Sequence, residues 1–480
     1  MSHGPKSKPL NPLGKLADSL RSIRARHERR HRPSGYGFAF ADRVDFLDPA
    51  RWDRITSGST VFLSRDLLRA VEQHGPDNIA PRYVMVFRDN EPVAALAAQI
   101  VTVTGEHLRR APGAPGQKTS LLRRALKPAA VAATANLRER ILVAGNLLSW
   151  GFHGISFAPG EDPAALWPAI AEALYRLRRA EKLTGQTNFV LVKDVTDAQH
   201  GLDVLHQFSY RPLETEPNMV LSIDSAWRSY DDYLAALDAK YRRNSKDQLK
   251  KLTAAGCTIE PLTNLEPHSR SIHALYKAVQ GKASVRLVTL GESYLPALSR
   301  ALGDRFRCTG IRRGEDLLGF VTTIRDGDTA IAYYIGFDRA AAAEGLPVYL
   351  RLLHTTIGDA ISWGCRKLSL GRTALEPKAA LGGKPEPMAV WMRHRVPAMN
   401  WLLRGLMGAI SHDEAPDRNP FKTRKRWPAQ GGARRVATAR AASSGANLSC
   451  PFTSTAFTSP SDAITCPQQE SLPWQHVRRS

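Results

Sequence analysis

The chain has 480 residues and a formal net charge of +22 at pH 7, and 43% of its residues are hydrophobic. A chain of this length is expected to hold about two to four domains. It has no uninterrupted apolar run of about 18 residues, so no transmembrane helix is predicted. The five cysteines form no C-x-x-C pair, which argues against a disulfide framework or a zinc site and favours a reducing, cytoplasmic compartment.

Most of the positive charge lies in residues 1–34, 105–141 and 413–480. Basic segments attract polyanions such as RNA, anionic lipid head groups or phosphorylated substrates, although solvated arms are equally compatible with them. The first segment lacks the apolar region of a secretory signal, and we expect a basic flexible arm over residues 1–40. The Ser-, Thr-, Ala- and Pro-rich end predicts a disordered tail over residues 412–480.

The interior of the chain carries one order of elements twice. Apolar and alternating runs predict first-half strands at 82–87 and 93–103, a helix around 166–177 and a strand at 188–192. The same patterns predict second-half strands at 306–311, 317–324 and 329–337, a helix around 350–361 and a strand at 366–371, with a hairpin at Asp326-Gly327. A strand meander followed by a helix and a strand, given twice, indicates an α/β fold.

Two other segments join or interrupt these halves. One long helix is predicted from Ser229, which forms a capping-box pattern with Asp232, to Gly256. The first half exceeds the second by about the length of residues 105–145, so we expect a basic insertion there that contains a second amphipathic helix.

Two local motifs accompany this order. KYRRNSKDQLKKLTAAGCTIE, at 240–260, is a basic helical segment followed by a glycine and a strand-like run. It is similar to the Lys-x-Arg-x-Asn-Ile-Arg helix of Fem-type transferases and of the related BioF-like acetyltransferase domain. Lys378-Ala379-Ala380-Leu381-Gly382 resembles the Lys-x-x-Phe/Leu-Gly motif of the same group. Over roughly residues 45–410 the chain therefore resembles tandem GNAT-type acyltransferase domains.

This resemblance implies an α/β (α+β) fold of two tandem GNAT-like domains, each a mixed, mostly antiparallel sheet flanked by helices. We expect the first domain at 41–225 and the second, catalytic domain at 226–411. The implied activity is N-acyl transfer, in which an acyl or aminoacyl group moves from an activated donor to an amine. Fem-type enzymes take amino acids from aminoacyl-tRNA, and other members use acyl-CoA. The usual GNAT phosphate loop, Arg/Gln-x-x-Gly-x-Gly/Ala, is present in neither half, so acyl-CoA, acyl-carrier protein and aminoacyl-tRNA all remain open.

Acyl transfer requires a positioned donor, a stabilised oxyanion and neutralised phosphates. Arg372 and Lys378 are the predicted catalytic residues. They follow a strand at its carboxyl end, where open α/β sheets place ligands, and the resemblance implies that Lys378 faces the active site. A solvated loop lysine is the alternative reading of Lys378.

The remaining candidates bind substrate or donor. The resemblance implies that Arg242, Arg243 and Asn244 grip a phosphorylated substrate. Tyr333 and Tyr334 are adjacent on a strand, so we expect them to point to opposite faces, with one of them lining the cleft. The expected donor-binding residues lie at the start of a helix: Gly345, which allows close backbone approach, Pro347, which suits a first helical turn, and Val348.

We expect no metal. The predicted partners are an amine-bearing small molecule or a cell-envelope precursor, with tRNA and an anionic membrane surface as further candidates. Residues 10–32, 120–141 and 394–410 are amphipathic and could lie on the inner membrane or pack against the domains. The alternative is a non-catalytic GNAT-fold binding protein that acts on anionic membrane or RNA. Arg372 and Lys378 facing a groove between the halves would favour the enzyme.

Overall fold

The computed structural model describes most of the chain between residues 32 and 400. The described residues are 32–105, 138–196, 198–281, 287–400 and 418–422, together with Arg21, Arg24 and Glu28. All of them lie in one unit, Met1–Thr423. Most of the predicted basic arm, much of the predicted insertion and nearly all of the predicted tail are outside these residues.

Thirteen strands of the described residues form one mixed sheet. The strands are β1 (Gly37–Ala41), β2 (Ile79–Arg88), β3 (Glu91–Thr104), β4 (Arg138–Ala144), β5 (Ile155–Phe157), β6 (Thr187–Val195), β7 (Arg211–Ser222), β8 (Cys257–Pro261), β9 (Phe306–Arg313), β10 (Asp316–Asp326), β11 (Thr329–Phe337), β12 (Lys367–Ser369) and β13 (Lys384–His394). Their order is β1-β2-β3-β4-β6-β13-β7-β12-β11-β10-β9-β8, with β5 paired to β3. The β4–β6 and β11–β12 pairs are parallel and the others are antiparallel.

The helices repeat the same duplication. The first half has α2 (Pro49–Thr56), α3 (Arg65–His74) and α5 (Pro163–Ala180), with short 3-10 helices η1 (Val44–Phe46), η2 (Val61–Leu63), η4 (Glu181–Leu183) and η5 (Leu202–Phe208). The second half has α6 (Tyr230–Ala236), α7 (Ala239–Ala254), η6 (Glu266–His268), α8 (Ser269–Gln280), α9 (Tyr294–Leu302), η7 (Gly303–Arg305), α10 (Arg339–Ala343), α11 (Val348–Ser362) and α12 (Leu375–Ala380). Each half thus runs strand, two helices, strand meander, helix, strand, which confirms the predicted mixed α/β fold with tandem GNAT-like units.

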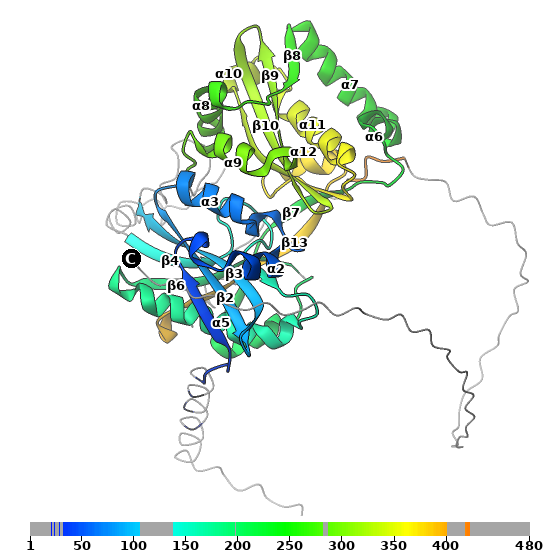
Figure 1. The fold of residues 1–480 in the computed structure, drawn as a ribbon. Coiled ribbons are helices and arrows are strands. Elements are labelled where there is room, and N and C mark those ends of the chain that lie inside the picture. The colour runs from blue at the N-terminus through cyan, green and yellow to red at the C-terminus, as the bar shows by residue number, and fades with distance from the viewer. Residues whose placement is uncertain are drawn as a thin grey trace, which may run out of the picture. The chain divides into compact units, whose positions relative to one another are not determined.

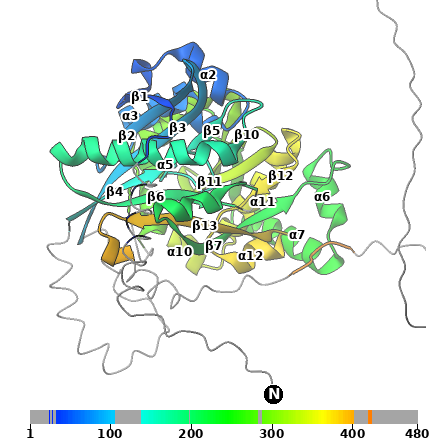
Figure 2. The ribbon, with the colours of Figure 1, turned by 90° about the horizontal axis from the view of Figure 1, so that it is seen from below.

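One strand from the end of the second half completes the sheet of the first half. β13 lies between β6 and β7, with Met392 opposite Leu191 of β6 and opposite Arg211 of β7 (Figure 2). β7 in turn pairs with β12 of the second half through Val220–Ser222. The two halves are therefore joined through the middle of one sheet, although a boundary between domains is predicted at 225/226.

Apolar clusters lie on both faces of the sheet. In the second half, α8 and α9 lie on one side of β9–β11 and α11 on the other (Figure 1). The cluster beneath α8 and α9 also contains Phe62 and Leu67 of the first half. Helix α5 packs on the first-half strands through Leu166, Trp167 and Ile170, all fully buried. The apolar side chains at helical spacing that predicted this helix are thus its buried face.

Two local expectations are wrong. Residues 138–144, inside the predicted insertion, form strand β4, whose Leu142 pairs with Ile100 of β3 and Val190 of β6. The predicted long helix is two helices, α6 and α7, interrupted at Leu237–Asp238. The predicted start is confirmed, because Ser229 and Asp232 form the capping box of α6. At the other end, Gly256 follows α7 in the left-handed conformation.

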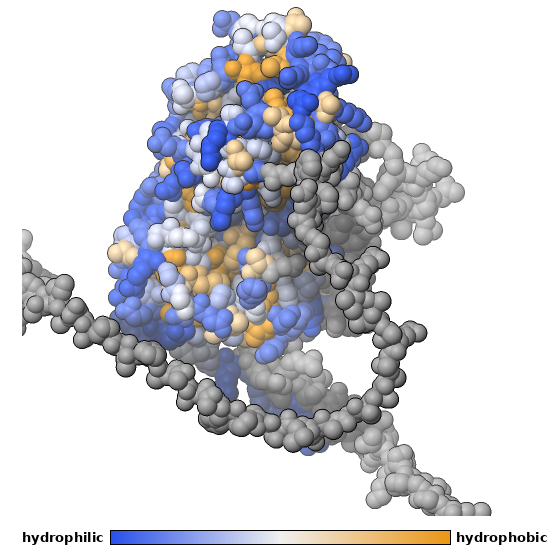
Figure 3. Space-filling view, turned by 90° about the vertical axis from the view of Figure 1, so that its right-hand side faces the viewer, coloured by the Kyte–Doolittle hydropathy of each residue, from blue (hydrophilic) through white to orange (hydrophobic). Residues whose placement is uncertain are grey.

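The side shown in Figure 3 is mostly hydrophilic, with apolar residues in small separate areas. Among the helices that the structure describes, none combines the length and apolar character that spanning a bilayer requires. Most of the predicted amphipathic segments 10–32, 120–141 and 394–410 lie outside the described residues.

Candidate functional site

Strands β11 and β12 separate toward their carboxyl ends. They pair only from Thr329–Ile331 to Lys367–Ser369. β11 then continues to Phe337 beside β10, whereas the chain beyond β12 turns to β7, where Leu370 N donates to Met219 O at 2.8 Å. Two neighbouring parallel strands that part at this edge form the place where an open α/β sheet receives a ligand.

A β-bulge sits in β11 where the two strands part. Ala332 lies opposite Thr323 and Ile335 opposite Val321, so Tyr333 and Tyr334 together oppose Thr322. The Thr322 hydroxyl accepts a hydrogen bond from Tyr334 N at 2.9 Å, which satisfies an amide that the bulge removes from the ladder.

This bulge corrects the expected orientation of the two tyrosines. Their rings lie 4.6 Å apart between centroids, and both pack against one apolar cluster. The expectation that they point to opposite faces is wrong, because the extra residue breaks the alternation of side chains along the strand. The Tyr333 hydroxyl bonds that of Tyr294 at 2.9 Å, and the Tyr334 hydroxyl donates to Leu148 O at 3.2 Å. A role for either in substrate binding stays a prediction.

A segment of the first half contacts both parted strands. The Trp150 indole N–H donates to the Ser369 hydroxyl at 2.8 Å, and its ring lies 6.2 Å from that of Tyr333. A Cβ built on Gly371, which has a φ of +84°, would lie 3.1 Å from Trp150, so this position favours glycine. Trp150 was not singled out from the sequence, where it is one aromatic residue in a loop.

The segment between β11 and α11 is the predicted donor-binding region. Gly345 has a φ of +85° and open space where a Cβ would stand. Pro347 is the N-cap residue of α11, one position before the expected first turn. Val348 is fully buried, and its N–H donates to Leu346 O at 2.9 Å. Of the three predicted donor contacts, Gly345 is therefore the most open.

Arg339, at the start of α10, is a candidate that sequence reasoning missed. Its Nε is buried, and within the described part of the chain it has no hydrogen-bond partner. No ion pair of its guanidinium occurs there either. An arginine between Asp338 and a run of four alanines gave no sequence signal of this kind.

Arg372 has a counterion that the sequence did not suggest. Its guanidinium lies 3.1 Å from the Asp194 carboxylate of the first half. Asp194 is fully buried, pairs with Lys193, and accepts from Gly151 N at 3.0 Å. Burial lowers the pKa of Lys193, and Asp194 opposes this effect. A catalytic role for Arg372 stays a prediction, but the residue is part of a charged junction between the halves.

Lys378 is buried on α12. It is 4% exposed, so the alternative of a solvated loop lysine is wrong. Burial lowers its pKa to about 7, and the nearby charge of Glu216 opposes that effect. Within the described residues, its ammonium forms no hydrogen bond or ion pair. A lysine of this kind is partly neutral near pH 7 and can take up a proton.

The three residues predicted to grip a phosphorylated substrate lie on α7, and their role in binding stays a prediction. Arg242 donates to Leu237 O at 2.9 Å, at the end of α6, whereas Arg243 and Asn244 are exposed. Asn244 lines a cavity of about 220 Å³ together with His354 of α11. Burial lowers the pKa of His354 to about 3, so its imidazole is neutral near pH 7.

Comparison with known proteins assigns the second half. Residues 239–379 match the family model described as an acetyltransferase (GNAT) domain. This part of the chain is therefore a GNAT-type domain, and the predicted resemblance is confirmed. Comparison with curated protein sequences finds no match. Among the described residues there is also no group of three His, Cys, Asp or Glu side chains that could hold a metal ion.

Several solved structures are similar at low identity. FemX is 12% identical, with 70% of this chain and 96% of that chain covered at a TM-score of 0.41. A tandem GNAT protein from the clavulanic acid biosynthesis pathway is 12% identical, with 75% and 99% covered at 0.43. The C-terminal domain of a putative lysylphosphatidylglycerol synthetase from Agrobacterium fabrum is 11% identical, with 74% and 94% covered at 0.41. TM-scores this low do not support an assignment by themselves. The assignment to the GNAT family therefore rests on the family-model match at residues 239–379.

Proposed function

We propose that this protein is an N-acyltransferase that moves an acyl or aminoacyl group from an activated donor to an amine. The observation that carries the proposal is the parting of β11 and β12 within a domain that matches the GNAT family. In that fold the donor lies between the two parted strands, with its phosphates near the start of the next helix.

The residues near α11 fit a donor that carries phosphates, such as acyl-CoA or aminoacyl-tRNA. Arg339 offers a buried Nε without a partner among the described residues. Gly345 leaves open space for close approach, and the first turn of α11 carries no acidic side chain. These residues would hold the phosphates, and the donor itself would supply the activated carbonyl.

The reaction needs a neutral amine and a place for its proton. The acceptor nitrogen attacks the donor carbonyl, an N–C bond forms, and the C–S or C–O bond to the donor breaks with the electron pair leaving on sulfur or oxygen. Lys378, partly neutral near pH 7, would take up the proton that the amine loses. The product is an amide, and no covalent acyl-enzyme is required.

The acceptor belongs to the same proposal. We infer an amine-bearing small molecule or cell-envelope precursor, with an anionic membrane surface or tRNA as further partners, in the cytoplasm or at the inner membrane. Arg243 and Asn244, both exposed on α7, remain candidates for its recognition. Arg242 is a weaker candidate, because it already caps α6.

Donor preference and turnover test the proposal. The purified chain is incubated with acetyl-CoA, a long-chain acyl-CoA or aminoacyl-tRNA and a panel of amines, and amide product is measured. We expect transfer with one donor, a rise in kcat/KM with pH about an apparent pKa near 7, and loss of turnover in Lys378→Met. Lys367→Met, an exposed lysine on β12, is the matched control.

A second candidate is a GNAT-fold binding protein without catalysis. It is favoured by Trp150, which contacts Ser369 in the last β11–β12 pair and Tyr333 beyond that pair. In that case thermal shifts would reveal binding of a donor or of anionic lipid, but no amide product would form with any donor. Normal turnover of Lys378→Met would instead remove Lys378 from the mechanism.

A further inference from the structure

Helix α7 presents a face of positive charge to solvent. Its buried residues are Ser245, Gln248 and Leu252. With about 3.6 residues per turn, the opposite side of the helix carries its exposed cations, which we call the basic face: Lys240, Arg243, Lys246, Lys250 and Lys251. Asp247 is the one acidic residue within α7. Figure 1 shows α7 at the outer edge of the second half.

The basic face has no counterion within the described residues. None of its five side chains forms an ion pair or a hydrogen bond there, and Asp247 does not pair with any of them. Like charges three or four positions apart on a helix repel each other, as Arg243, Lys246 and Lys250 do. The arrangement therefore lowers the stability of α7 unless an anionic partner compensates it.

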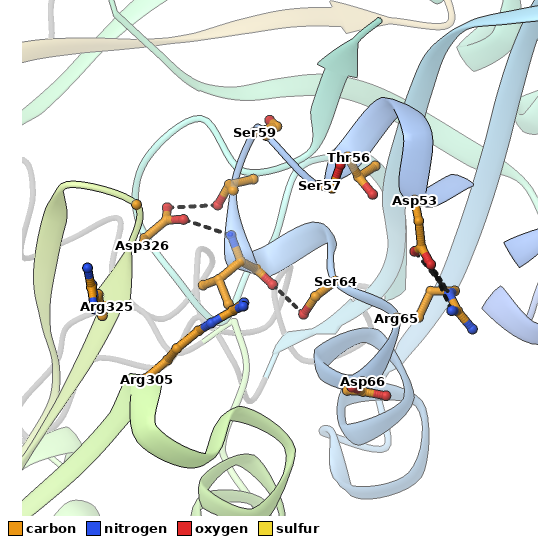
Figure 4. A pocket seen from close by; sticks show the side chains of 14 residues that line it. Asp53, Thr56, Ser57, Ser59, Ser64, Arg65, Asp66, Arg305, Arg325 and Asp326 are labelled. Atoms are coloured by element: carbon orange, nitrogen blue, oxygen red, sulfur yellow. Dashed lines mark hydrogen bonds and ion pairs between the residues drawn. The ribbon is translucent and has the colours of Figure 1, made fainter. Parts of the chain in front are cut away.

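The cations of helix α3 are arranged differently. Figure 4 shows Arg65 paired with Asp53, at 2.8 Å, and Arg69 pairs with Asp66 at 2.8 Å. Both arginines of that helix thus have a carboxylate from the chain itself. The contrast singles out α7 as the helix whose charge is left for a partner.

We propose that the basic face docks on an anionic lipid surface. Each Lys or Arg held near such a surface raises the affinity by about fivefold. Lys246 and Lys251, at the two margins of the face, are separated by about 140° around the helix, and long flexible lysine side chains can reach one plane from both margins. The apolar side of α7 is buried in the domain, so this docking is electrostatic and needs no insertion.

Two features favour lipid over RNA as the polyanion. Lipid head groups move laterally and can gather under a broad face, whereas the phosphates of an RNA strand follow a line. RNA-binding surfaces also stack bases on aromatic rings, and the basic face has none, because Tyr241 of α7 packs against the apolar cluster of the domain. The anionic membrane partner is taken from the proposed function. Vesicle binding is measured without donor or acceptor, so its failure would not bear on the transfer reaction.

Co-sedimentation of the full chain with vesicles tests the basic face. The vesicles contain phosphatidylglycerol and phosphatidylcholine in equal amounts, at low ionic strength. Replacing Lys246→Gln together with Lys250→Gln should weaken binding about 25-fold, since two cations are lost. Arg270→Gln together with Lys277→Gln is the matched control, because it removes two exposed cations from α8, and it should bind as the unchanged chain does.

The same variants give the results that would overturn the proposal. Equal weakening by both double variants would show only general attraction to a basic protein. Unchanged vesicle binding of the α7 variant would show that the face does not dock, and equal binding to pure phosphatidylcholine would remove the role of negative charge. Loss of binding to a short RNA duplex, with vesicle binding intact, would assign the face to RNA instead. Thermal unfolding of each variant confirms that lost binding does not reflect lost folding.

Discussion

Replacing Lys378 with methionine should make the protein more stable near neutral pH. The lysine is 4% exposed, and its ammonium has no hydrogen bond or ion pair among the described residues. Methionine has a similar length and no charge, so it fits the same space without an unpaired ion. We therefore expect the free energy of unfolding to rise. Replacing a lysine that forms an ion pair would lower it instead.

The magnitude follows from the change in pKa. Burial lowers the pKa of Lys378 from 10.5 to about 7, and at about 1.36 kcal/mol for each pH unit this destabilises the folded state by roughly 5 kcal/mol below pH 7. The unfolded chain binds more protons between the two pKa values, so the cost falls as pH rises through this interval. At about pH 9 it should be roughly 2 kcal/mol.

Urea unfolding at about pH 6.5 and pH 9 measures this effect. Lys378→Met should have the larger free energy of unfolding at both pH values, and its advantage should shrink at the higher one. Lys367→Met, on exposed β12 sequence, should differ from the unchanged chain by less than about 0.5 kcal/mol. A Lys378→Met variant equal to or less stable than the unchanged chain at pH 6.5 would refute a buried, unpaired lysine.

Two further substitutions test the junction and the bulge. Asp194→Asn should destabilise the protein by about 3–5 kcal/mol, because it leaves Lys193 and Arg372 without their shared carboxylate. An unchanged midpoint of urea unfolding would mean that these two ion pairs contribute nothing to stability. Thr322→Val should cost about 1–3 kcal/mol, because the Tyr334 amide loses its acceptor. Thr355→Val is the control, because the Thr355 hydroxyl donates to Leu352 O within the same helix. Comparing the thermal unfolding of the two variants separates the loss of the Tyr334 acceptor from a general effect of valine.

Local sequence patterns predicted the strands that are apolar along most of their length. β3 and β10 are buried over most of their residues, so hydrophobic runs and the Asp326-Gly327 turn were enough to place them. β4 was not predicted, because it begins with Arg-Glu-Arg beside a basic segment. Its apolar second part is short, and its pairing with β3 and β6 decides that it is a strand.

The site was predicted less well because its geometry depends on distant residues. Arg372 and Lys378 were singled out by position and resemblance, but the Asp194 carboxylate that holds Arg372 lies 178 positions away in the chain. The bulge that turns Tyr333 and Tyr334 to one side requires the register with β10. Neither a counterion from another half nor a register shift leaves a periodic signal in one sequence.

The place of β13 also constrains how this polypeptide is made. Until residues 384–394 have left the ribosome, β6 and β7 lack the strand that separates them. The nascent chain must therefore hold two open strand edges while residues 223–394 are synthesised, a state that invites wrong pairing with other chains. For the same reason a gene fragment that stops after β7 encodes an incomplete module, and co-expression with the missing strand should restore its solubility.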